Sequence, residues 1–148
     1  MAFTDAAATW NARFAAGHYI FGTEANAWLR EQAHHIAPGR RVLCVADGEG
    51  RNSVWLARRG HRVDAFDIAE TGIRKARALA TGAGVAVNFA VADGDALRWP
   101  AALYDAVVTI FIQFPDPAMR ARLFTNMVHT LKPGGVLVLQ GYTPKQLE

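Results

Sequence analysis

A glycine turn and an acid placed after it are the residues of this sequence best suited to ligand chemistry. The turn Gly48–Gly50 follows the apolar run 42–45, and Asp67 closes the next apolar run, 63–66. A buried strand that leads through a tight glycine turn into a helix lets the backbone approach a ligand closely. An acid at the end of the following strand can accept hydrogen bonds from both hydroxyls of a ribose. The spacing therefore predicts a pocket for an adenosine-containing cofactor.

The composition is that of one globular domain. The chain has 148 residues, of which 51% are hydrophobic and 20% are charged. We find no apolar run of the roughly 18–20 residues that a membrane helix needs and no secretory signal at the N-terminus. The single cysteine, Cys44, excludes an internal disulfide and a multi-cysteine metal site, and it lies inside an apolar run. We expect a cytoplasmic protein with no membrane partner and no metal.

The positive charge is modest and scattered. The formal net charge is +3 and the sequence pI is about 9.4. Basic residues gather at 58–62 and 74–77, which are expected helix surfaces, and no aromatic side chains alternate with them as a nucleic-acid platform would require. We therefore expect a small-molecule partner and no nucleic acid.

Helices and strands alternate along the chain. Hydrophobic periodicity and turn residues predict helices over 5–17, 23–37, 53–59, 70–81 and 119–131, and strands over 42–45, 63–66, 85–91, 104–112 and 136–139. This alternation is typical of an α/β fold with a mostly parallel sheet and helices on both faces. We expect a single domain, in which residues 1–39 form a helical lid and residues 40–148 form the α/β core.

The turns after four of the expected strands carry acids or other polar groups. They are Asp47–Asn52, Asp67–Ile68, Ala92–Gly94 and Phe111–Gln113. Ligands of such sheets bind at the carboxyl ends of the strands, where the strand order reverses. We therefore expect these turns to face one pocket.

The chain resembles the class I S-adenosylmethionine-dependent methyltransferases, and within them the tellurite-resistance group and its thiopurine methyltransferase relatives. The motifs that carry the resemblance, which spans the whole chain, are Trp10-x-x-Arg13-Phe14, Tyr19-x-Phe21-Gly22-x-x-x-Asn26-x-x-Leu29, Gly48–Asn52, Asp67, Ala92-Asp93, Tyr104–Val107, Leu131–Gly135 and Gly141–Pro144. The resemblance implies a Rossmann-like fold and S-adenosylmethionine as cofactor, with S-adenosylhomocysteine as product.

The resemblance also implies roles for single residues. The turn 48–50 would pass under the methionine part of the cofactor, Asp67 would bind the ribose, and Ile68 would pack on the adenine. In the turn formed by Ala92 and Gly94, Asp93 would bind the adenine amine, unless Asp95 does so in its place. The main chain of Phe111 would bind the methionine amine. Tyr19 and Phe21 would form a lid. Trp10, Phe14 and Trp28 have the spacing of core residues, although a lid role stays open for them.

The sequence departs from the family pattern around the first strand and at its end. Many relatives have an acid at position 44 and a glycine at position 46, whereas this chain has Cys44 and Ala46 and places its acids at Asp47 and Glu49. We expect at least one of these acids to contact the cofactor, and Asn52 either to do so or to start the helix. The family fold has two further strands beyond Tyr142, so we expect either a truncated copy or a short variant, whose exposed sheet edge could form a homodimer.

The expected reaction is methyl transfer to a small-molecule acceptor, with no catalytic residue assigned. A sulfonium methyl group is already activated, so a soft nucleophile such as a thiol or a tellurite-type or selenite-type oxyanion needs little help from a base. Two alternatives stay open. One is a non-catalytic binding or assembly module, and the other is a nicotinamide-dependent oxidoreductase, which the serine at position 53 disfavours because a dinucleotide turn has its third glycine there.

Overall fold

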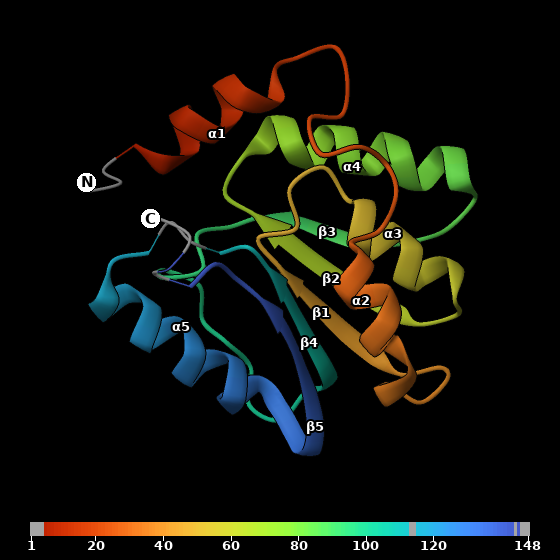
Figure 1. Cartoon of the computed structure of the whole chain (residues 1–148), viewed down its shortest axis with the longest axis vertical. Helices are drawn as coiled ribbons and strands as arrows, with labels where there is room; N and C mark the ends of the chain where they lie inside the picture. The colour runs from red at the N-terminus through yellow and green to blue at the C-terminus, as the bar shows by residue number, and fades with distance from the viewer. Residues whose placement is uncertain (1–4, 113–114, 144, 146–148) are drawn as a thin grey trace.

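The computed structural model of the chain describes residues 5–112, 115–143 and 145. Its elements, in chain order, are α1 (Ala6–Phe14), α2 (Ala27–Gln32), the short 3-10 helix η1 (Ala33–His35), β1 (Arg41–Val45), α3 (Arg51–Arg58), β2 (Arg62–Asp67), α4 (Glu70–Ala83), β3 (Asn88–Val91), β4 (Tyr104–Ile110), α5 (Pro117–Thr130) and β5 (Leu131–Gln140). Figure 1 shows one sheet with helices on both of its faces. The predicted α/β architecture is confirmed.

The five strands form one parallel sheet in the order β3-β2-β1-β4-β5. The chain runs outward from β1 to β3, returns to the centre at β4 and ends at the other edge with β5. The strand order therefore reverses between β1 and β4, where Val45 pairs with Thr109 on one side and with Phe66 of β2 on the other. Ligands of doubly wound sheets bind at the carboxyl ends of the strands beside this reversal.

Alternate residues of β1 enter two separate cores, because successive side chains of a strand point to opposite faces. Val42 and Cys44 pack with residues of α2, α3 and α4 on one face. Leu43 and Val45 pack with α5 and with Trp99 on the other face. The central strands β1 and β4 are therefore apolar on both faces over Val42–Val45 and Ala106–Val108, as a parallel sheet covered on both faces requires.

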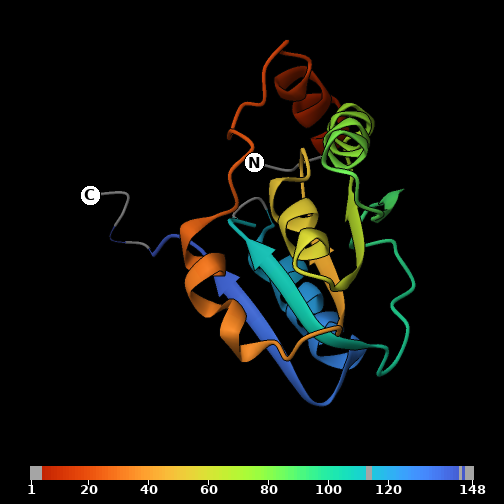
Figure 2. The same cartoon turned by 90° about the vertical axis from the view of Figure 1, so that its right-hand side faces the viewer.

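An N-terminal segment crosses the carboxyl edge of the sheet. Helix α1 packs on α4, and α2 lies beside β5. Residues 15–26, which we call the strap, connect the two helices without helix or strand of their own, as Figure 2 shows. The predicted helix start at Thr23 is wrong: α2 begins at Ala27, because the Asn26 side chain accepts a hydrogen bond from the Leu29 amide at 3.0 Å and caps the helix there.

Strands β3 and β5 differ most from their predicted bounds. Strand β3 begins at Asn88 instead of Val85, because the Val85 amide donates to the Ala80 carbonyl and closes the end of α4. Strand β5 begins at Leu131, and its pairing with β4 is irregular before Val136. In the part of the chain that the structure describes, we find no helix with the length and apolarity that crossing a bilayer demands.

Candidate cofactor-binding site

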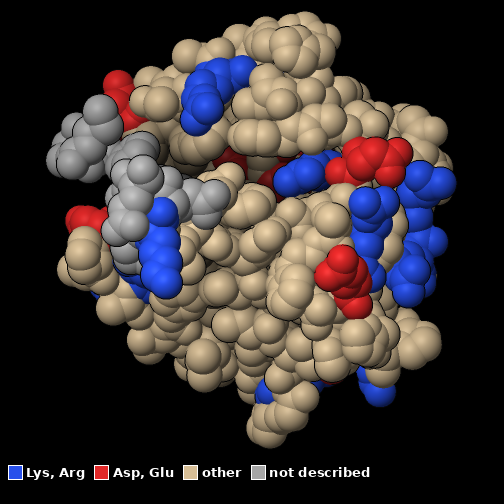
Figure 3. Space-filling view, viewed as in Figure 1, with Lys and Arg blue, Asp and Glu red and all other residues tan. Residues whose placement is uncertain are grey.

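A cavity of about 290 Å³ lies at the carboxyl edge of the sheet. Its walls come from α1, the strap, the ends of β1, β2 and β4, the turn after β3, the first residues of α3, and α5. The lining residues are Ala6, Trp10, Phe14, Phe21, Val45, Ala46, Asp47, Gly48, Arg51, Asn52, Phe66, Asp67, Ile68, Ala92, Asp93, Gly94, Asp95, Ile110, Phe111, Met119 and Leu123. Figure 3 shows the hollow on this face, with acidic side chains recessed at its floor and a basic side chain near its rim.

Asp67 is fixed at the end of β2 by backbone amides. Its Oδ2 accepts from the Gly48 amide and its Oδ1 from the Ala69 amide, both at 2.9 Å, and the residue is 6% exposed. Burial raises the pKa of this carboxyl, and the amide hydrogen bonds oppose that rise. Each carboxylate oxygen has further acceptor capacity, so Asp67 can receive two ligand hydroxyls while it holds the glycine turn in place.

Asp47 forms a second acidic position in the cavity wall. Its Oδ2 accepts from the Ser53 hydroxyl at 2.5 Å and its Oδ1 from the Ser53 amide at 3.3 Å. Burial raises the pKa of Asp47 to about 7, a rise that these hydrogen bonds oppose and the nearby Asp67 increases. The serine at position 53, where a dinucleotide turn has glycine, therefore has a structural role here as the partner of Asp47.

Arg51 is the one lysine or arginine among the described lining residues of the cavity. It is the first residue of α3, and its guanidinium lies 5.9 Å from the centre of the Phe21 ring. Partial burial lowers its pKa, while the charge of Asp47 raises it. No separate role was predicted for Arg51 from the sequence, where its place directly after the glycine turn is the available signal.

The backbone adopts positive φ at the end of each strand that flanks the reversal. Ala46 follows β1 with φ 51° and Phe111 follows β4 with φ 57°. This region is unfavourable for residues with a side chain, and such strain is concentrated at functional sites. The φ of Ala46 also explains why glycine suits this position. Phe111 is supported by its ring, which stacks on Tyr142 with centroids 4.7 Å apart.

Aromatic side chains of the N-terminal segment close one side of the cavity. Phe14 is 2% exposed and is therefore both core and cavity wall, whereas Trp10 is half-buried, stacks on Phe14 at 5.4 Å and lines the cavity. A Cβ at Gly48 would lie 3.3 Å from the Phe14 ring, and one at Gly72 would lie 2.9 Å from it. The core role predicted for Trp28 is wrong, because this residue is 40% exposed.

The structure brings most of the predicted site residues together in this wall. Those in the wall are Ala46, Asp47, Gly48, Asn52, Asp67, Ile68, Ala92, Asp93, Gly94, Phe111 and Phe21, whereas Glu49, Gly50 and Tyr19 lie outside it. Asn52 also ties α3 to the strap, because its Oδ1 accepts from the Asn26 amide at 2.9 Å. Gln113, predicted to lie in the turn after β4, falls outside the described residues.

The acids after β3 differ in their partners. Asp95 receives two hydrogen bonds from the Arg122 side chain, both at 2.8 Å. Asp93 Oδ1 accepts from the Asp95 amide at 2.9 Å, which shapes the turn. Because Arg122 engages both carboxylate oxygens of Asp95, the geometry favours Asp93 as the acid that faces a ligand.

Comparison with known proteins agrees with this architecture. Residues 42–135 match the family described as methyltransferase domain. Among curated proteins, the chain is 32% identical over 111 residues to an uncharacterized protein of Mycobacterium tuberculosis, covering 74% of this chain and 40% of that one. It is 37% identical over 102 residues to the ubiquinone biosynthesis O-methyltransferase of Xylella fastidiosa, covering 67% of this chain and 40% of that one. The chain thus spans about 40% of the length of these relatives.

Solved structures with the same fold include the PH0226 protein of Pyrococcus horikoshii, with a TM-score of 0.75 and 29% identity over 80% of this chain and 57% of that one. A second is a S-adenosylmethionine-dependent methyltransferase of Methanosarcina mazei, with a TM-score of 0.69 and 25% identity over 78% of this chain and 57% of that one. The chain belongs to the methyltransferase domain family, and its sheet is the Rossmann-like sheet of class I methyltransferases.

The cavity fits S-adenosylmethionine, the cofactor of this family. Asp67 offers carboxylate oxygens to ribose hydroxyls, and Ile68 offers an apolar surface beside it. The glycine at position 48 leaves open the space that a Cβ would fill between the turn and the Phe14 ring. The acids of the wall suit the positive charges of the methionine amine and the sulfonium, and Arg51 suits its carboxylate.

Proposed function

We propose that this chain carries the S-adenosylmethionine-binding half-site of a methyltransferase that acts on a small-molecule acceptor. The observation that carries the proposal is the Asp67 carboxylate, which is buried at the end of β2, bonded to the Gly48 amide and exposed to the cavity. This is the position from which an acid receives a ribose in nucleotide-binding α/β sheets. The names of several relatives support the same activity.

S-adenosylmethionine supplies an activated methyl group when it is bound. The chain would hold the ribose through Asp67 and the adenine between Ile68 and the turn at Asp93. The backbone after β4 at Phe111 would orient the methionine end. Trp10, Phe14 and Phe21 would exclude water from the transferring methyl group, since methyl transfer needs alignment and a dry site more than proton transfer.

The acceptor that we propose is a soft nucleophile, either a thiol or an oxyanion of the selenite or tellurite type. Among the described residues that line the cavity, the groups that could accept a proton are aspartates, and there is no serine, histidine, cysteine, lysine or tyrosine. A nucleophile that is anionic near neutral pH does not need such a base. The resemblance of the motifs to those of the tellurite-resistance and thiopurine groups, which we expect from the sequence, favours this acceptor class.

The test is a transfer assay that measures formation of S-adenosylhomocysteine with three acceptor classes. We would offer alkyl and aryl thiols, then selenite and tellurite, then a catechol as a hard oxygen acceptor. The proposal predicts product with at least one soft acceptor and none with the catechol. Product with the catechol alone would overturn the acceptor class. Binding of the cofactor with no product from any acceptor would support a non-catalytic module instead.

A further inference from the structure

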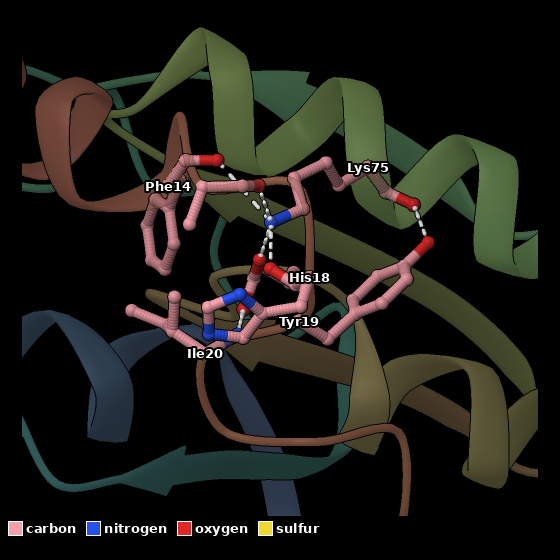
Figure 4. A network of polar contacts seen from close by, with 7 residues as sticks. Phe14, His18, Tyr19, Ile20 and Lys75 are labelled. Atoms are coloured by element: carbon pink, nitrogen blue, oxygen red, sulfur yellow. Dashed lines mark hydrogen bonds and ion pairs between the residues drawn. The ribbon is translucent and has the colours of Figure 1, made fainter.

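The Lys75 side chain of α4 binds backbone carbonyls at the end of α1 and at the beginning of the strap. Its Nζ donates to the carbonyls of Phe14 at 3.2 Å, Ala16 at 3.1 Å and His18 at 2.6 Å. The Phe14 carbonyl belongs to the last turn of α1, where helix geometry leaves carbonyls without partners in their own helix, and the carbonyls of Ala16 and His18 belong to the strap. Lys75 therefore caps α1 from a neighbouring helix, as Figure 4 shows.

Glu49 of the glycine turn contacts both the strap and Lys75. It is the middle residue of the glycine turn and is 4% exposed. Its Oε1 accepts from the Ile20 amide at 2.8 Å, and its Oε2 forms an ion pair with Lys75 Nζ. The side chain thus points away from the cavity and holds the strap, which explains why Glu49 does not line the wall.

Tyr19 closes the network on its outer side. Its hydroxyl donates to the Lys75 carbonyl at 3.0 Å, and its ring centre lies 5.1 Å from Lys75 Nζ. A cation at this distance from a ring face is attracted to it. Tyr19 therefore fastens the strap to α4 (Figure 4) and does not itself cover the cavity.

We propose that Glu49 and Lys75 are positioning residues that couple the floor of the cofactor cavity to its cover. On the floor side is the turn 48–50, of which Gly48 lines the cavity, and on the cover side are Phe14 and Phe21, which line it as well. Since Glu49 belongs to the turn and bonds both the strap and Lys75, the strap can keep its place only while the turn keeps its shape. This inference rests on the proposed function, because it assigns the network a role in retaining the cofactor.

The test compares Lys75→Met, Lys75→Arg and Glu49→Gln with the wild-type chain. Lys75→Met keeps the aliphatic stem and removes the charge, and Lys75→Arg restores the charge. Lys132→Met is the matched control, because Lys132 pairs with Asp105 at 3.4 Å at the opposite edge of the sheet. The measurements are the dissociation rate of S-adenosylmethionine by stopped flow and hydrogen exchange of the amides of residues 15–26 without ligand.

We expect Lys75→Met and Glu49→Gln to raise the cofactor dissociation rate about tenfold or more, since loosening a segment that closes a binding cavity acts mainly on ligand release. We expect faster exchange of the Ile20 amide in both variants, recovery in Lys75→Arg, and no change in Lys132→Met. Faster exchange in the strap with a dissociation rate unchanged from wild type would overturn the inference, since the network would then be a structural fastening alone.

Hydrogen exchange of the strap amides distinguishes a failure of this inference from a failure of the proposed function. Should the wild-type chain fail to bind S-adenosylmethionine, the proposed function fails, and the network is still tested by exchange in the strap. Exchange at Ile20 that is the same in wild type and in Lys75→Met would overturn the network itself. Tyr19→Phe, which keeps the ion pair and removes only the hydroxyl, serves if Lys75→Met does not fold, and a smaller rise in both measurements is expected from it.

Discussion

Substitution of Gly50 by alanine tests how closely the glycine turn packs on α4. Gly50 has φ +90°, and a Cβ there would lie 2.7 Å from the Ala76 Cβ and 3.0 Å from its Cα. The contacting atoms belong to a short side chain and to a helix backbone, so they cannot rotate away. Alanine in this backbone conformation costs about 1–2 kcal/mol, and overpacking against fixed atoms adds about 1–3 kcal/mol. We expect a loss of about 2–5 kcal/mol in the free energy of unfolding.

Gly60→Ala is the matched control for backbone strain. Gly60 has φ +92°, close to that of Gly50, but a Cβ there would meet nothing within 4 Å. The free energy of unfolding of Gly60→Ala should therefore fall by the backbone strain alone, about 1–2 kcal/mol. The difference between the two variants therefore isolates the contact with Ala76.

The assay is urea unfolding followed by the fluorescence of the four tryptophans, with the free energy extrapolated linearly to water. The double variant Gly50→Ala/Ala76→Gly removes the 2.7 Å contact and should regain part of the stability, which a double-mutant cycle measures. Equal losses for Gly50→Ala and Gly60→Ala would refute the close packing of the turn on α4.

Two further predictions concern Asp47 and Ala46, which both line the cavity. Because burial raises the pKa of Asp47 from 3.8 to about 7, the folded chain retains a proton that the unfolded chain releases, so wild-type stability falls as pH rises through that window. The free energy of unfolding of Asp47→Asn relative to wild type should therefore rise by about 1–3 kcal/mol between pH 4 and pH 8. Thermal unfolding curves of both proteins at several pH values measure this difference. A difference that shrinks as pH rises would contradict the prediction. Ala46→Gly and Ala102→Gly, at φ 51° and 48°, should each stabilise the fold by about 0.5–1 kcal/mol in urea unfolding. Of these two variants only Ala46→Gly should alter cofactor affinity, since Ala46 lines the cavity.

The parts of the fold that depend on local patterns were predictable from the sequence. The apolar runs predicted where the strands lie. The glycine turn and Asp67 predicted the position of the cavity, because the carboxyl ends of the strands in a parallel sheet meet at one edge. The start of α2 was not predictable, since Thr23 and Asn26 are both good capping residues and the choice depends on the contact between Asn26 and Asn52.

The network around Lys75 was beyond sequence reasoning for a different reason. Lys75 lies in an amphipathic helix among other basic residues, where a solvated charge is the ordinary interpretation. Its partners Glu49 and His18 come from two other segments, and only the fold brings them together. Glu49 was expected near the cofactor because of its place between two glycines, whereas the structure turns its side chain toward the strap.

Isothermal titration of S-adenosylmethionine into the wild-type chain and into Asp67→Asn tests the central claim most directly. The matched control is Asp105→Asn, at the opposite end of the sheet, where Asp105 accepts from the Arg41 amide at 2.9 Å. NADH serves as the control ligand. We predict binding of one cofactor per wild-type chain, no binding of NADH, and affinity unchanged in Asp105→Asn. Asp67→Asn should weaken binding by about 1–3 kcal/mol, which is about 5- to 150-fold in the dissociation constant. Equal affinity in Asp67→Asn and wild type, or binding of NADH in place of S-adenosylmethionine, would contradict the account.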